Sequence, residues 1–297
     1  MIAFLLCNRG VLHSFHSHIL AGAEAYCASQ DYGVLFLSLT YSPEVRWKDI
    51  HLPAILRRHD VVRAAMVAGT NSQNLFAQLT HQGMPFVVLG NNVLGEWNSD
   101  EYNAVYFDDI EGAREVTRYL LALGHRNVWF AGNLRLPWFT RRYEGYRQIM
   151  EEAGLTPRLS EFQSNDEDDV GYLAVKSILQ NNGKVSAIFA GGDTVARGAY
   201  RALRDKGLRI PGDVAVVGFN DTEASILHPA LTTVRAFPEQ VGARLAEVVL
   251  EVMARPELAP KQCTIPTQLV KRESCAPWAY SHEEGENGNQ ENIQAAP

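Results

Sequence analysis

The sequence is short of the features that mark secreted, disulfide-bonded or membrane-spanning proteins. It has four cysteines, Cys7, Cys27, Cys263 and Cys275, and none of them forms a C-x-x-C pair. Isolated thiols of this kind are typical of reduced, mostly buried cysteines in a cytoplasmic protein. No apolar run approaches the roughly 18 residues of a membrane span. The opening residues MIAFLLCNRG lack the basic region of a signal peptide, so they are expected to form a buried strand.

Positive charge is also scarce. The 297-residue chain has 27 Lys and Arg against 34 Asp and Glu, which gives a formal net charge of −7. A surface that neutralises phosphates or lies on anionic lipid would carry the opposite balance. Neither duplex DNA nor a membrane is therefore expected as a direct partner of these residues. The hydrophobic content of 46% predicts a sizeable core, and the length allows one large or two medium domains.

The sequence also lacks the common motifs of catalysis and cofactor binding. It has no G-x-S-x-G, no P-loop and no G-x-G-x-x-G after the first apolar run. His13, His16 and His18 form a cluster, but no carboxylate or thiol stands at ligand spacing beside them. We therefore expect no catalytic residue, no cofactor and no metal. An enzyme stays an alternative, because a fold does not fix a function.

What the sequence does contain is a regular alternation of short apolar runs and amphipathic stretches. The clearest unit is Ala187–Ala190, then a helix with Asp193 as its expected N-cap, then Val214–Val217. Two parallel strands joined by a helix end at the same edge of a sheet, where open α/β folds bind ligands. We expect the functional site at this edge.

The same alternation fills two halves of similar make-up. It predicts an α/β fold in which each half is a parallel sheet flanked by helices. One predicted helix spans residues 141–153, so Trp138 and Phe139 are placed in the loop before it. The acidic segment 161–169 is expected to be exposed. Residues 279–297 have almost no apolar content and are expected to be a disordered tail.

Seven short motifs carry a family resemblance. In chain order they are Val105-Tyr-Phe-Asp108 with Leu123-Gly-His-Arg126, Arg142-Tyr-Glu-Gly-Tyr146, Gly192-Asp-Thr-Val-Ala196, Ile210-Pro-Gly-Asp213, Val217-Gly-Phe-Asn-Asp221, Pro229-Ala-Leu-Thr-Thr-Val234 and Leu269-Val-Lys-Arg272. Each motif is weak alone, but all seven stand in the same order as in one family. The chain resembles, nearly end to end, the effector-binding core of the LacI-type transcription repressors.

This resemblance implies the periplasmic-binding-protein type I fold, with two Rossmann-like lobes joined by three crossovers. The implied first lobe comprises residues 1–108 and 236–263, and the second comprises 109–235 and 264–278. A homodimer and a small-molecule effector in the cleft between the lobes are implied as well. LacI-type repressors carry a helix-turn-helix before this core, whereas here the first strand is expected at Ile2, so DNA is a partner only if that module is supplied by other residues.

The resemblance also implies which second-lobe residues face the cleft. Arg142 matches the family's cleft arginine, and its fork of N–H donors suits hydroxyl pairs or a carboxylate. Asn220 stands where the family has Asp, and Gly192 where it often has Asn. We expect truncation of Arg142 to weaken ligand binding and leave folding nearly untouched. Asp193 is included as a ligand-binding candidate, although capping its helix is the stronger interpretation.

The remaining candidates are aromatic or structural. Phe15 and His16 match the aromatic pair that opens the family's first helix and lines the cleft, while Trp138 and Phe139 precede Arg142. Exposed aromatics at a sheet edge often form a pocket wall, but simple core packing fits these residues equally well. Polar recognition is thus expected from the second lobe and an apolar wall from the first. Asp108 and Asp221 are interpreted as structural or hinge residues.

Together these inferences predict the ligand-sensing core of a LacI-type transcriptional regulator. It would bind a small sugar or related metabolite in the cleft and change the geometry of the lobes and the dimer. Two alternatives stay open: a stand-alone cytoplasmic sugar-binding protein with no role at DNA, and an enzyme on the same fold.

Overall fold

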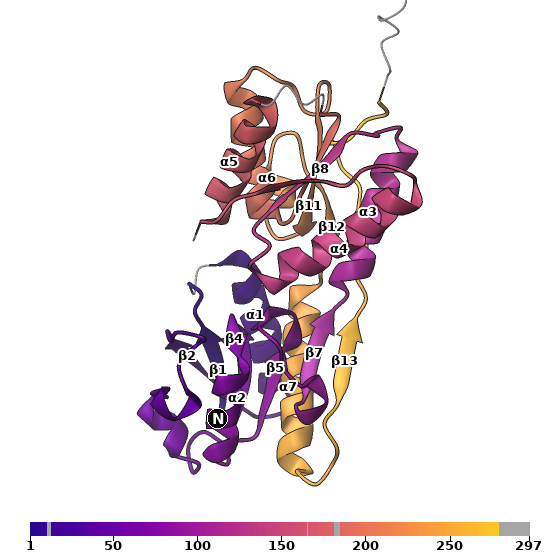
Figure 1. Ribbon diagram of the computed structural model, residues 1–297. Helices are drawn as coiled ribbons and strands as arrows, with labels where there is room; N and C mark the ends of the chain where they lie inside the picture. Colours follow the sequence, from indigo (N-terminus) through magenta and orange to yellow (C-terminus); the bar gives the residue numbers. More distant parts are fainter. Residues whose placement is uncertain (11–12, 165, 181–184, 279–297) are drawn as a thin grey trace, which may run out of the picture.

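The computed structural model describes residues 1–10, 13–164, 166–180 and 185–278, and the expected tail at 279–297 lies outside the described residues. The described residues form two α/β lobes, one above the other in Figure 1. The chain passes between them after residue 107, after residue 235 and after residue 265. The predicted fold class is confirmed.

The first lobe is built on a six-stranded sheet with the order β13-β7-β5-β3-β1-β2. Its strands are β1 (Ile2–Cys7), β2 (Val34–Leu39), β3 (Ala64–Gly69), β5 (Phe86–Leu89), β7 (Ala104–Phe107) and β13 (Gln262–Ile265), and every pairing is parallel. Its helices are α1 (Ser14–Ser29), α2 (Gln73–His81) and α7 (Pro238–Ala254). A small two-stranded sheet pairs β4 (Asn71–Ser72) with β6 (Val93–Leu94).

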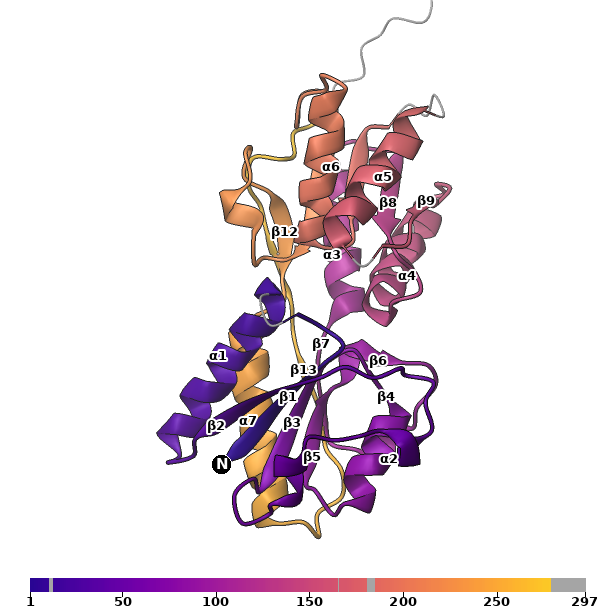
Figure 2. The same cartoon turned by 90° about the vertical axis from the view of Figure 1, so that its left-hand side faces the viewer.

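Strand β1 lies inside this sheet because all six of its residues are apolar and buried. Alternate side chains point to opposite faces of a strand. Phe4 accordingly belongs to the core under α1 and α7, whereas Leu5 belongs to the core under α2. Figure 2 shows these helices on the two sides of the sheet. A strand buried on both faces needs such a continuous apolar run.

The second lobe repeats this plan with the strand order β14-β12-β11-β10-β8-β9. Its strands are β8 (Val128–Gly132), β9 (Arg158–Glu161), β10 (Ala187–Ala190), β11 (Ala215–Asn220), β12 (Thr232–Arg235) and β14 (Gln268–Val270). Its helices are α3 (Asp109–Ala122), α4 (Pro137–Glu152), α5 (Glu167–Gln180) and α6 (Asp193–Asp205). Among these strands β14 departs from the parallel arrangement, since it runs antiparallel to β12.

Each lobe contains a helix pair in which glycines on both helices allow close contact. A methyl group on Gly22 of α1 would overlap the backbone of Glu239 in α7, and one on Gly242 would overlap the backbone of Ile19. In the second lobe the same holds for Gly171 of α5 and Gly198 of α6. Both helix pairs therefore depend on the absence of a side chain at two facing positions.

Some local expectations differ from the structure. Helix α4 begins at Pro137, so Trp138 and Phe139 lie in its first turn and not in a preceding loop, because proline fits the first position of a helix. Gly192, not Asp193, is the N-cap of α6. Strand β13 continues to Ile265 because it pairs with β7 up to Phe107, so the third crossover follows residue 265 and not residue 263.

No helix of the described residues combines the length and the apolar character that crossing a membrane requires.

Candidate functional site

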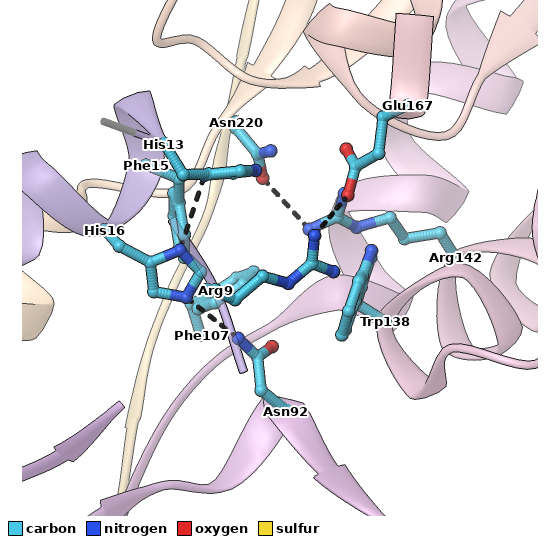
Figure 3. Close-up of a pocket in the computed structure, with 10 residues that line it drawn as sticks. All are labelled: Arg9, His13, Phe15, His16, Asn92, Phe107, Trp138, Arg142, Glu167 and Asn220. Carbon is cyan, nitrogen blue, oxygen red and sulfur yellow. Dashed lines mark hydrogen bonds and ion pairs between the residues drawn. The ribbon is translucent and has the colours of Figure 1, made fainter. Parts of the chain in front are cut away.

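A cavity lies between the two lobes, at the carboxyl ends of strands from both sheets. Figure 3 shows its lining side chains. They are Arg9, His13, Phe15, His16, Asn92, Phe107, Trp138, Arg142, Glu167 and Asn220. The first six belong to first-lobe segments, and the other four belong to α4, α5 and β11 of the second lobe. Closing the lobes would therefore surround a ligand with groups from both sides.

Arg142 is the most strongly held polar side chain of the site. Its Nε donates to Asp109 Oδ1 at 2.8 Å, its Nη1 to the backbone oxygen of Gly191 at 2.6 Å and its Nη2 to Asn220 Oδ1 at 3.0 Å. The guanidinium also stacks on the Phe219 ring, 3.9 Å from the ring centroid. Burial lowers the pKa of Arg142, and the neighbouring carboxylate of Asp109 partly opposes this shift.

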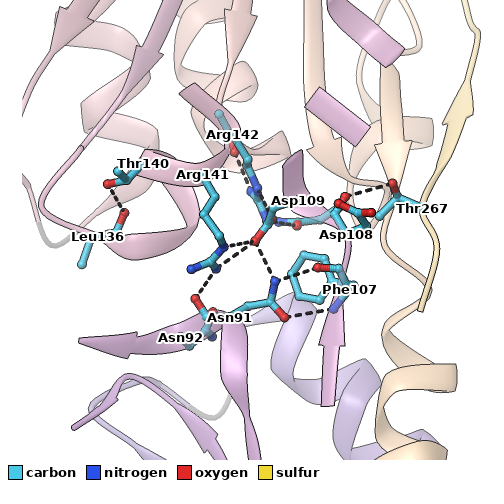
Figure 4. Close-up of polar contacts among 12 residues, drawn as sticks. Asn91, Asn92, Phe107, Asp108, Asp109, Leu136, Thr140, Arg141, Arg142 and Thr267 are labelled. Carbon is cyan, nitrogen blue, oxygen red and sulfur yellow. Dashed lines mark hydrogen bonds and ion pairs between the residues drawn. The ribbon is translucent and has the colours of Figure 1, made fainter. Parts of the chain in front are cut away.

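Asp109 lies behind the cavity and links the lobes. Its Oδ2 accepts from Asn91 Nδ2 at 2.7 Å and from Arg141 Nε at 3.0 Å (Figure 4). Arg141 Nη2 also donates to the backbone oxygen of Asn91, which follows β5 in the first lobe. This fully buried carboxylate pairs with two guanidinium groups, so the cluster fixes the orientation of Arg142.

A second ion pair closes the cavity towards solvent. Arg9 follows β1 in the first lobe, and its Nη1 lies 3.3 Å from Glu167 Oε1 at the start of α5 in the second. Arg9 Nε donates to Thr70 Oγ1 at 3.3 Å, and its guanidinium lies 4.5 Å from the centroid of the Trp138 ring. Arg9, His13 and Glu167 also line an outer cavity, so they lie between the inner pocket and its mouth.

Two imidazoles complete the first-lobe wall. His16 Nδ1 lies 3.3 Å from His13 Nδ1, and His16 Nε2 lies 3.4 Å from Asn92 Nδ2. Burial lowers the pKa of both rings, so both are neutral at pH 7. Because the Asn92 amide nitrogen can only donate, His16 Nε2 accepts and its proton is on Nδ1. His16 then donates to His13 Nδ1, which leaves the proton of His13 on Nε2.

This arrangement of two lobes and a polar interlobe pocket has known relatives. The model of the periplasmic binding protein-like domain matches residues 117–275, which is more than half of the chain. The chain belongs to this family. The resemblance to the effector-binding core of LacI-type regulators is likewise confirmed by the relatives.

Among curated proteins, the HTH-type transcriptional repressor PurR of Pasteurella multocida is 28% identical over 242 residues, which cover 80% of this chain and 70% of that protein. The Ribose operon repressor of Haemophilus influenzae is 27% identical over 266 residues, covering 88% and 77%. These relatives are named as repressors and not as enzymes.

Solved structures of the family have the same fold. A LacI family transcriptional regulator from Enterococcus faecium with bound ribose superposes with a TM-score of 0.78 at 23% identity, covering 93% of this chain and 100% of that one. The complex of the transcriptional regulator CelR with cellobiose gives a TM-score of 0.77 at 25% identity, covering 92% and 84%. Both likenesses extend over nearly all of this family member.

The structure brings five of the expected site residues together in the cavity, namely Phe15, His16, Trp138, Arg142 and Asn220. Gly192 borders the pocket, since a methyl group built on it would lie 3.9 Å from Arg142 Nη1 and from Asn220 Nδ2. Phe139 does not line the cavity. It is fully buried in the core of the second lobe, where it packs beside Trp138 and against the backbone of Gly191.

Three expected aspartates are engaged inside the second lobe or at its junctions. Asp193 accepts from Thr233 Oγ1 at 2.7 Å and from the backbone nitrogen of Thr222 at 2.8 Å. Burial raises the pKa of Asp193 to about 7. Asp221 pairs with Arg235 and Arg272, at 2.6 Å each. Asp108 accepts from the backbone nitrogen of Glu111 and thereby caps α3 at the first crossover.

Sequence reasoning missed Arg9, Asn92, Phe107 and Glu167, and it considered His13 only as a metal ligand. Glu167 belongs to the acidic segment that is expected to be exposed, yet its side chain is only 11% exposed because it faces Arg9. Arg9 and Asn92 each follow the carboxyl end of a buried first-lobe strand, which is a signal that could have identified them. The expected division into a polar second lobe and an apolar first lobe is wrong, since the first lobe supplies Arg9 and two histidines.

Proposed function

We propose that this chain is the ligand-sensing core of a LacI-type transcriptional regulator and that it binds a small sugar-like metabolite in the interlobe cavity. The observation that carries the proposal is the pairing of aromatic faces with fixed polar groups around one cavity. Trp138 and Phe15 offer apolar surface, while Asn220 and the neutral His13 offer hydrogen bonds. Sites for small polar molecules combine these two kinds of surface.

The ion pairs between the lobes support a coupling of binding to lobe movement. Arg9 and Glu167 lie on opposite lobes and line both the inner pocket and its mouth, so a ligand could enter only after they separate. A ligand that contacts both lobes favours the closed state by its differential affinity for the two states. Closure would then alter the geometry of a homodimer, which symmetric operator sites require.

The regulatory role itself would be exerted at DNA in the cytoplasm. One neighbour of this fold is the lac repressor dimer bound to operator, with a TM-score of 0.74 at 21% identity. The formal charge of −7 argues that this chain does not bind duplex DNA by itself. We expect sedimentation at micromolar concentration to show a dimer and a gel shift with this chain alone to show no sequence-dependent complex.

A thermal-shift screen against sugars and related metabolites tests the ligand-sensing function. A ligand at about 100 times its Kd stabilises the fold by about 2.7 kcal/mol, which is easily detected. Trp138→Ala should reduce such a shift, whereas Trp129→Ala, on the same lobe but away from the cavity, should not. Stabilisation that is equal in both variants would place the ligand elsewhere. A stand-alone binding protein would bind the ligand equally well, so a search for operator release by that ligand separates the two functions.

A further inference from the structure

The cavity presents many more hydrogen-bond donors than acceptors. Arg142 has five N–H groups, and the described residues accept hydrogen bonds from three of them. Arg9 likewise makes two hydrogen bonds with the described residues. Both guanidinium groups therefore have N–H groups left for a ligand.

The amide of Asn220 adds to this excess. Because Arg142 can only donate, the oxygen of the Asn220 amide must face it, and the amide nitrogen faces the other way. Among the described residues this nitrogen has no acceptor, and it lies near the space beside Gly192. His13 presents its Nε2 proton, because its Nδ1 accepts from His16. The side-chain acceptors of the cavity are the carboxylate of Glu167 and the amide oxygen of Asn92.

The charges of the side chains around the cavity also favour a ligand that accepts hydrogen bonds. Arg9 and Arg142 are positive and Glu167 is negative, while Asp109 behind the cavity is balanced by Arg141. The site thus has one uncompensated positive charge. A hydroxyl group brings a proton that needs an acceptor, whereas an ionised carboxylate accepts at two oxygens and donates nothing.

We propose, building on the proposed function, that the effector carries a carboxylate and is a sugar acid, not a neutral sugar. Its carboxylate takes the free donors of Arg142 and Asn220 in the space that Gly192 leaves beside them. A methyl group on Gly192 would lie 3.7 Å from Glu167 Oε2, so the Glu167 carboxylate borders the same space. Glu167 therefore opposes the anion and must remain with Arg9 or swing outward when the ligand binds.

The first experiment is a thermal-shift and calorimetric screen with matched sets. Each set contains a neutral hexose or pentose, its aldonic acid, its uronic acid and its phosphate ester. We expect an acid to bind at least about tenfold more tightly than its neutral parent. Tighter binding of a neutral sugar overturns the carboxylate assignment and leaves the sensing function in place. Preference for the phosphate ester overturns it too, and binding by no member counts against both proposals.

Two substitutions test the assignment at the residues themselves. Asn220→Asp replaces a donor by a negative charge and should weaken acid binding by about tenfold or more, with a neutral parent changed by less than about threefold. Asn98→Asp, an exposed change of the same kind in the first lobe, is the control and should change neither. Equal effects of Asn220→Asp on acid and neutral ligands would overturn the proposal.

Glu167→Gln should change the preference for an acid ligand in the opposite direction to Asn220→Asp. Removing the competing carboxylate should raise the ratio of acid to neutral affinity by about three- to tenfold. The ratio is the useful measurement, because loss of the contact with Arg9 loosens closure for both ligand classes alike. A ratio that stays constant or falls would mean that Glu167 is itself a ligand acceptor, and the carboxylate assignment would then be wrong.

Discussion

The two lobes have the same strand order but use their polar residues differently at the cavity. In the second lobe, Arg142 is tied into the core by Asp109, Gly191 and Asn220, and its side chain is 2% exposed. In the first lobe, Arg9 is 14% exposed and contacts Thr70 and the facing lobe. The second lobe thus presents a pre-organised group that also stabilises its own fold, whereas the first presents one that closure brings into place.

Replacing each of the two arginines by alanine should reveal the largest difference between the lobes, measured as the loss in the free energy of unfolding. Arg142→Ala leaves the Asp109 carboxylate buried with one guanidinium fewer, so we expect a loss of about 3 kcal/mol or more in the free energy of unfolding. Arg9→Ala should cost less than this, because Glu167 also lines the outer cavity and can turn towards solvent once the guanidinium is gone. Urea unfolding measures both. Equal losses would mean that both arginines are structural, and the expectation that truncating Arg142 spares folding is replaced by this one.

Away from the cavity we expect the two lobes to respond alike to substitution of the glycines between α1 and α7 and between α5 and α6. Gly22→Ala in the first lobe and Gly198→Ala in the second each place a methyl group against a facing backbone. Overpacking of this kind costs about 1–3 kcal/mol. Gly33→Ala is the control, since its methyl group would meet Met1 at an ordinary distance of 3.7 Å. A large cost in one lobe only, by thermal or urea unfolding, would contradict the equivalence of the two pairs.

A smaller difference concerns acid sensitivity. Burial lowers the pKa of His16 at the cavity and of His125 in the second lobe. In the unfolded chain these histidines have a pKa of about 6.5, so they bind protons at a higher pH than in the folded protein. The free energy of unfolding therefore decreases as the pH falls below about 6.5, by up to about 1.4 kcal/mol per pH unit for each histidine. His16→Gln and His125→Gln should each flatten this decline between about pH 6.5 and 5.

The pH dependence of stability can also be measured with bound ligand, which separates the two histidines. Of these two histidines, His16 alone lines the cavity, so a saturating ligand should change the pH profile of the wild type and of His125→Gln, and change that of His16→Gln least. An equal response in all three proteins would show that the His16 ring has no coupling to the site.

Much of the fold could be predicted because its signals are local. Val87, Phe189 and Val217 belong to short apolar runs that only a doubly covered strand explains, and the helices between them fix a parallel sheet. The edge that holds the cavity follows from the same topology. Arg142 and Asn220 could be assigned to the cleft because their motifs resemble those of the LacI-type family.

The remaining features depend on contacts that sequence spacing does not encode. Arg9 and Glu167 are 158 residues apart, and their pairing exists only when the lobes face each other. Within the second lobe, spacing alone does not distinguish Arg142 from a helix-surface arginine, because its partner Asp109 lies on another helix. The expectation of an exposed acidic segment before α5 fails at Glu167 for this reason, since a carboxylate is interpreted as exposed unless its partner is known.

The three passages between the lobes have a consequence for how the protein is made. The first lobe precedes the second in the sequence, but α7 and β13, which cover and extend its sheet, are supplied by residues 238–265. The second lobe is nearly continuous in sequence and lacks only β14 until the last described segment is synthesised. On a ribosome, the lobe that begins first should thus be completed only after most of its neighbour has emerged. We expect nascent chains that end before residue 238 to expose the apolar face that α7 covers, and such chains should depend on chaperones.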